Sequence, residues 1–132
     1  MFKFLLLSVL LDTGVAVGPA MCPKMLRADA SLGDTTAVCQ ISQLANGQDQ
    51  STCYWSYPVH ARDSGAQFDA LHDLIETCVK NASILPPEPG VNHPDTYDQR
   101  IYQGQGLRIS LSLKRKTALG KAFVFLGISP LP

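Results

Sequence analysis

The sequence predicts an α+β fold in which a small antiparallel sheet of about five strands packs on one amphipathic helix, stapled by two disulfides. The chain has 132 residues, a length that suits one small globular domain. One segment has helical periodicity, and strand-like segments lie on both sides of it, which gives the order β-β-α-β-β-β. An even number of cysteines in a short chain is typical of a disulfide framework, and here they are Cys22, Cys39, Cys53 and Cys78.

Residues 1–20 have the pattern of a signal peptide. Lys3 supplies a positive charge, residues 4–11 form an apolar run, and small residues precede a cleavage site after Ala20. The run is about half of the roughly 20 residues that a membrane span needs. We therefore expect a secreted, extracellular protein with no membrane span, whose residues 21–132 form a single domain.

The first strands are expected at residues 37–41 and 52–57, because both segments are rich in β-prone side chains. Between them, Asn46-Gly47 favours a two-residue hairpin turn. Such a turn makes Cys39 and Cys53 near neighbours that are not directly opposed. Residues 21–34 have no clear periodicity and are expected to form an irregular arm held by Cys22.

An amphipathic helix is expected at about residues 65–80, after a capping box formed by Ser64 and Gln67. Its apolar stripe consists of Phe68, Leu71, Leu74, Ile75, Cys78 and Val79. Because Cys78 lies on this buried stripe, we expect it to pair with Cys39 or Cys53, which leaves Cys22 for the other. The opposite face is acidic and carries Asp69, Asp73 and Glu76.

The last third of the chain returns to strand patterning. Residues 84–96 contain four prolines and are expected to form an extended surface loop. Strands are then expected at 100–102, at 107–113 with apolar and polar residues in alternation, and at 122–128, which is nearly all apolar. Residues 114–120 are expected to form a basic turn.

The net charge of zero conceals an asymmetry. Residues 21–98 hold four basic and ten acidic side chains, whereas residues 99–132 hold six basic and none acidic. The folded domain is therefore expected to have an acidic and a basic surface, and the expected binding patch consists of Arg108, Lys114, Arg115, Lys116 and Lys121. The run 114–116 also suits a solvated turn or a dibasic processing site.

Other features bear on ligands and modification. The spacing of cysteines and histidines matches no metal-binding pattern, so we expect disulfides and neither a metal nor a cofactor. The aromatic residues near the basic run are Tyr102, Phe123 and Phe125, too few for a base-stacking platform, so nucleic acid is not expected as a partner. Asn81-Ala82-Ser83 is an N-glycosylation site.

Two short segments, Tyr57-Pro58 and Asp98-Gln99-Arg100, bear on function. They resemble segments of the small secreted guanyl-specific ribonucleases of fungi. The resemblance implies phosphodiester cleavage by a base, an acid and a cation, and the candidates for these roles are His60, Glu76 and Arg100. The chain departs from the family because His60 stands one position late, the helix follows this segment, and no histidine follows Arg100. A ribonuclease-like scaffold that has lost its activity fits equally well.

The chain as a whole resembles the small secreted cysteine-stapled proteins of fungi, many of which are effectors or toxin-like proteins. This resemblance implies a non-enzymatic monomer that binds a host or competitor protein or surface and modulates host defence or virulence. In that interpretation no residue is catalytic. The alternatives are a secreted ribonuclease-like hydrolase and a small enzyme inhibitor or carbohydrate-binding module.

Overall fold

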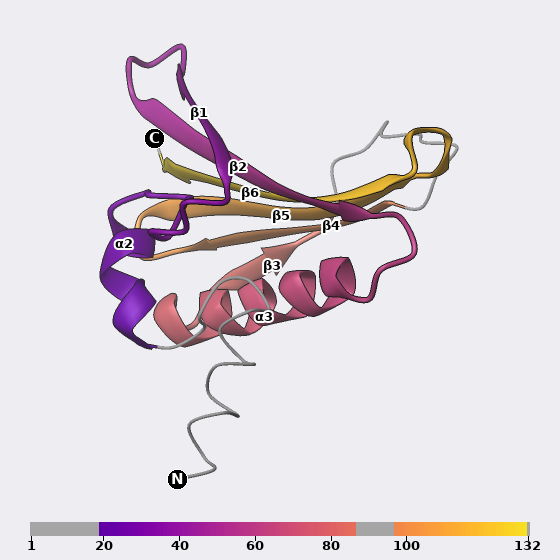
Figure 1. Ribbon diagram of the computed structural model, residues 1–132. Helices are drawn as coiled ribbons and strands as arrows, with labels where there is room; N and C mark the ends of the chain where they lie inside the picture. Colours follow the sequence, from indigo (N-terminus) through magenta and orange to yellow (C-terminus); the bar gives the residue numbers. More distant parts are fainter. Residues whose placement is uncertain (1–18, 87–96, 132) are drawn as a thin grey trace, which may run out of the picture.

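The computed structural model describes residues 19–86 and 97–131. Its strands form a six-stranded antiparallel sheet in the order β1-β2-β6-β5-β4-β3, and helix α3 lies under one face (Figure 1). The elements are η1 (Pro19–Met21), α2 (Cys22–Leu26), β1 (Val38–Gln43), β2 (Asp49–Pro58), α3 (Asp63–Cys78), β3 (Ser83–Leu85), β4 (Tyr97–Gly104), β5 (Leu107–Lys116), η2 (Thr117–Leu119) and β6 (Lys121–Pro130).

The predicted signal peptide falls almost wholly on residues 1–18, which lie outside the described residues. Its last two residues, Pro19 and Ala20, begin η1. Among the described helices, none is long and apolar enough to cross a membrane.

The prediction of about five strands packed on one helix is wrong in two respects. A sixth strand, β3, occurs where a loop was expected and pairs with β4 at the edge of the sheet. The helical layer also contains α2, which packs against α3, so that α3 does not cover the sheet alone (Figure 1). Both elements are short, and Pro23 in the first turn of α2 favours a helix start that apolar periodicity does not reveal.

The hydrophobic core lies between α3 and the central strands. α3 contacts β5, β6 and β2, whose alternate side chains point toward it. Burying each large apolar side chain stabilises the fold by about 1.5–3 kcal/mol. The buried side chains include Leu107, Ile109, Leu111 and Leu113 from β5, Val124, Leu126 and Ile128 from β6, Cys53 and Trp55 from β2, and Phe68, Leu71, Leu74 and Ile75 from α3.

The main helix begins and ends two residues earlier than expected, and the predicted capping box is absent. Arg62 is the N-cap and makes no side-chain capping hydrogen bond. Ser64 is instead the second helical residue, is buried, and donates its hydroxyl to the Ala61 carbonyl at 3.4 Å. Asp63 in the first turn still places a negative charge at the positive end of the helix dipole.

The disulfides are Cys22–Cys78 and Cys39–Cys53, so the expected pairing of Cys78 with Cys39 or Cys53 is wrong. The hairpin between β1 and β2 has a longer connection, residues 44–48, than the two-residue turn that was expected. This connection places Cys39 and Cys53 directly opposite each other. Cys22, at the start of α2, then joins the end of α3 and fixes the two helices together.

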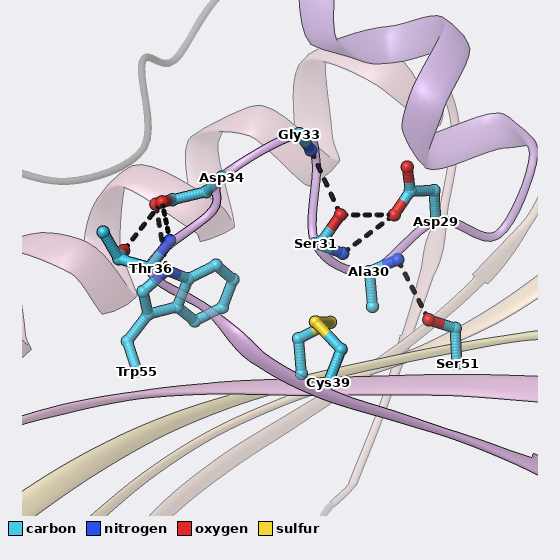
Figure 2. The surroundings of a disulfide bond; sticks show 10 residues. Asp29, Ala30, Ser31, Gly33, Asp34, Thr36, Cys39, Ser51 and Trp55 are labelled. Atoms are coloured by element: carbon cyan, nitrogen blue, oxygen red, sulfur yellow. Dashed lines mark hydrogen bonds between the residues drawn. A yellow bond between two sulfur atoms is a disulfide. The ribbon is translucent and has the colours of Figure 1, made fainter.

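The segment between α2 and β1 is held against β2 by polar contacts (Figure 2). Trp55 donates its indole N–H to the Asp34 carboxylate at 3.0 Å, and Ala30 donates its backbone N–H to the Ser51 hydroxyl at 3.2 Å. Burial raises the pKa of Asp34, but hydrogen bonds from Thr36 and Trp55 outweigh this effect and leave the pKa below its usual value. The ionised carboxylate is therefore the form that the folded state favours.

Candidate functional site

The sheet has one face covered by α3 and a second face, here called the outer face, on the opposite side (Figure 1). Side chains alternate between the two faces along each strand. Since Val124 and Leu126 of β6 are buried toward α3, the neighbouring Phe123 and Phe125 point to the outer face. The strand register then places Tyr54 of β2 beside Phe125 on the outer face.

Three aromatic side chains on adjacent strands gather on this face and are here called the ring cluster: Tyr54, Phe123 and Phe125. Their ring centroids lie 5.8 Å apart for Tyr54–Phe123, 5.6 Å for Tyr54–Phe125 and 6.0 Å for Phe123–Phe125. All three side chains are partly exposed. Lys114 Nζ lies 5.2 Å from the centroid of the Phe125 ring and 5.3 Å from that of Tyr97. The cluster therefore offers aromatic surface in direct contact with a cation.

Four of the five residues of the expected basic patch lie on the outer face. β5 continues as a strand through Lys116, which corrects the expected turn at 114–120, so Lys114 and Lys116 share a face. Lys121 pairs with Lys116 across β5 and β6, and Arg108 lies at the far end of β5. Arg115 points toward α3 instead. Its guanidinium lies beside Gly65 of that helix, where an added Cβ would be 3.8 Å from it.

The described strands place no carboxylate on the outer face. Asp49 and Asp98 occupy the positions that alternate to the face of α3. Asp69, Asp73 and Glu76 are exposed on α3 itself. The carboxylates of the strands and of α3 therefore lie away from the outer face, which carries four of the six basic residues of 99–132.

A groove of about 330 Å³ continues the outer face beyond the ring cluster. Its lining includes the buried Gly127, where an added Cβ would lie 3.6 Å from the Thr52 hydroxyl oxygen. Amide and hydroxyl groups provide hydrogen-bonding partners along it. The lining residues are Leu44, Asn46, Gln50, Arg108, Ser110, Gly127, Ser129, Pro130 and Leu131.

The residues implied by the ribonuclease resemblance do not form one site. His60 is exposed in the connection between β2 and α3, close to the start of the helix, whereas Glu76 lies in its last turn. At 1.5 Å per residue the helix separates these two ends by about 20 Å. Arg100 lies on β4 with its guanidinium 5.0 Å from the centroid of the Phe68 ring. The base and the carboxylate are therefore too far apart to act on one phosphate.

Glu76 instead belongs to a hydrogen-bonded chain that the sequence did not reveal. His72 Nδ1 lies 2.7 Å from the Tyr102 hydroxyl, and His72 Nε2 lies 3.1 Å from a Glu76 oxygen. Burial raises the pKa of Tyr102 to about 12, so its hydroxyl keeps the proton at neutral pH. The tautomer of His72 sets which partner donates in each of the two contacts. Because Tyr102 is fully buried, this chain ties α3 to β4.

His72, Asp73 and Glu76 each place a potential ligand atom within 4.8 Å of the other two. Both imidazole nitrogens of His72 already have partners, however, and two of the three side chains are exposed. The arrangement is accounted for by the contact between helix and sheet. It gives no separate reason to assign a metal.

Asn81 is exposed in the turn that follows α3. Its backbone has a left-handed conformation, with φ of 59°, which asparagine tolerates better than most residues. A glycan on this side chain would project at the edge of the sheet next to β3, away from the ring cluster on the central strands.

Comparison of the chain with protein-family models, with curated proteins and with solved structures finds no match.

Proposed function

We propose that this chain is a secreted, non-enzymatic, effector-like protein that binds a host or competitor target through its outer face and thereby modulates host defence or virulence. The observation that carries the proposal is the composition of that face. It combines the ring cluster with Arg108, Lys114, Lys116 and Lys121, and its described strand positions include no carboxylate. Such a surface recruits an anionic partner by electrostatic attraction and gains affinity by covering aromatic area.

The arrangement favours binding over catalysis. Rings, ammonium groups and a polar groove recognise a ligand, whereas hydrolysis needs a base and an acid near the same bond. The separation of His60 from Glu76 argues against a ribonuclease built on the residues that the sequence suggested. The buried Tyr102 hydroxyl of the hydrogen-bonded chain is likewise inaccessible to a substrate.

The scaffold supports this role because it holds the outer face rigid. The two disulfides tie α2 to α3 and β1 to β2, and no described cysteine is free. Disulfides of this kind persist in oxidising compartments, which agrees with the proposed secretion. A rigid face loses little conformational entropy when it binds.

The test compares two variants that each lose three positive charges. In the first, Lys114, Lys116 and Lys121 become alanine; in the control, the exposed Arg27, Arg62 and Lys80 become alanine. Each protein is titrated against heparin, polyglutamate, polygalacturonate and single-stranded polyuridylate at low salt, after circular dichroism has established that it is folded.

The intact protein should bind at least one of these polyanions. The outer-face variant should then bind it at least about tenfold more weakly, while the control keeps most of its affinity. Binding to none of them, or an equal loss in both variants, would refute a binding site on the outer face.

A further inference from the structure

The ring cluster lies where open antiparallel sheets present aromatic side chains to unpaired bases. Its rings come from the adjacent strands β2 and β6, near the middle of the sheet, while the helices cover the opposite face (Figure 1). The centroids are separated by 5.6–6.0 Å, and each ring remains partly exposed. Stacking of a base on such a ring contributes about 1–3 kcal/mol and tolerates any base.

The cations lie on both sides of the rings along the strand direction. Lys116 and Lys121 form a cross-strand pair at one end, and Lys114 contacts the Phe125 ring. Arg108 lies six residues before Lys114 on β5, which is about 20 Å at 3.3 Å per residue. A chain of phosphates running along β5 and β6 therefore meets positive charge at each end and aromatic surface between.

The groove near Arg108 adds hydrogen-bonding groups to this track. Gln50, Ser110 and Ser129 offer hydrogen-bond donors and acceptors beside Gly127. The volume of the groove is at the lower end of the range for pockets that bind small ligands. A base edge or a sugar hydroxyl finds partners there that an ammonium group alone does not supply.

We infer that the outer face binds single-stranded nucleic acid, with bases stacked on the ring cluster and phosphates held by the cations of β5 and β6. This inference rests on the proposed function and names its target. An acidic protein segment would use the same cations but has no need of three clustered rings. The lack of a described carboxylate on the face also argues against a neutral sugar chain, whose hydroxyls are good donors to carboxylates.

The sequence alone did not favour this partner, and the fold explains the difference. Tyr102, one of the three rings near the basic run in the sequence, points toward α3 and not to the outer face. The strand register places two other rings, Tyr54 of β2 and Tyr97 of β4, on the outer face. Neither residue is close to the basic run along the chain.

The test measures fluorescence anisotropy of labelled 12-nucleotide oligonucleotides with the full mature chain. The probes are oligouridylate, oligothymidylate and an RNA duplex, with heparin and polyglutamate as polyanions that lack bases. The ring variants are Tyr54→Leu, Phe123→Leu and Phe125→Leu. The control is Val38→Ala, which removes an exposed apolar side chain that pairs with Tyr54 on the same face.

At least one of the single-stranded probes should bind at least about tenfold more tightly than the duplex, and it should remain uncut. Each ring variant should weaken this binding by about 5- to 100-fold, and Val38→Ala should leave it unchanged. Ring variants that keep full affinity, or heparin or polyglutamate binding as tightly as the oligonucleotides, would overturn the nucleic-acid inference while the proposed function stands. If none of the polyanions binds, the nucleic-acid inference and the proposed function both fail. Cleavage of the RNA probe would refute the non-enzymatic role.

Discussion

Replacing Lys114, Lys116 and Lys121 by alanine should change the salt dependence of nucleic-acid binding by a predictable amount. Each phosphate that a cation neutralises on a single strand contributes about −0.7 to the slope of log affinity against log salt concentration. The outer face offers these three lysines and Arg108, so the intact protein should have a slope of about −2.8. The variant, which keeps only Arg108, should have a slope of about −0.7.

Anisotropy titrations with single-stranded oligouridylate, from low to physiological salt, measure this slope directly. Phe123→Leu is the matched variant, because it removes a stacking ring that has no described cation–ring contact. It should lower the affinity at every salt concentration and leave the slope close to that of the intact protein. The two variants therefore separate the electrostatic contribution from the stacking contribution.

A triple variant that keeps the slope of the intact protein would refute phosphate binding by Lys114, Lys116 and Lys121, because the phosphates would then be bound elsewhere. A slope much steeper than about −2.8 for the intact protein would mean that cations outside the outer face also take part.

Three further predictions concern the scaffold. Replacing Cys22 and Cys78 by serine should lower the free energy of unfolding by about 4 kcal/mol, against about 3 kcal/mol for the hairpin bridge, because it opens a 56-residue loop instead of a 14-residue one; urea unfolding showing the opposite order would contradict this. Asp34→Asn should cost about 1 kcal/mol at pH 7, because the ionised carboxylate accepts the indole and threonine hydrogen bonds. The folded-state pKa lies below 3.8, so this difference should shrink as the pH falls below about 4, and a full difference at pH 2 would refute its origin. Mass spectrometry of the secreted protein should show Met21 as the first residue, no free thiol and a glycan on Asn81; two or more free thiols would contradict the disulfide framework.

The fold shows where sequence periodicity is informative. The helix and the central strands follow from patterns of apolar side chains, since α3 buries a stripe of residues three and four apart and β5 buries alternate residues along most of its length. β3 has three residues and precedes Pro86, and α2 has five, so neither is long enough to display a period. The disulfide pairing depended on a hairpin register that one connection of five residues, 44–48, was sufficient to change.

The site shows a different limit. The sequence located the basic residues, but whether Lys114 and Lys116 share a face depends on β5 extending three residues beyond the expected strand. The ring cluster depends on the pairing of β2 with β6, which joins Tyr54 to Phe125 across a long separation in the chain. The contact between His72 and Tyr102 also joins residues far apart in the chain, so the sequence could not show it. The contact between His72 and Glu76 could have been expected, because residues four apart lie side by side on a helix.

The most direct test of the outer face as the binding site is an NMR measurement of contacts between the protein and a bound single-stranded oligonucleotide. The account predicts nuclear Overhauser effects from the ring protons of Tyr54, Phe123 and Phe125 to base protons, and none from the exposed residues of α3. Contacts confined to α3, with the ring resonances unchanged, would contradict it.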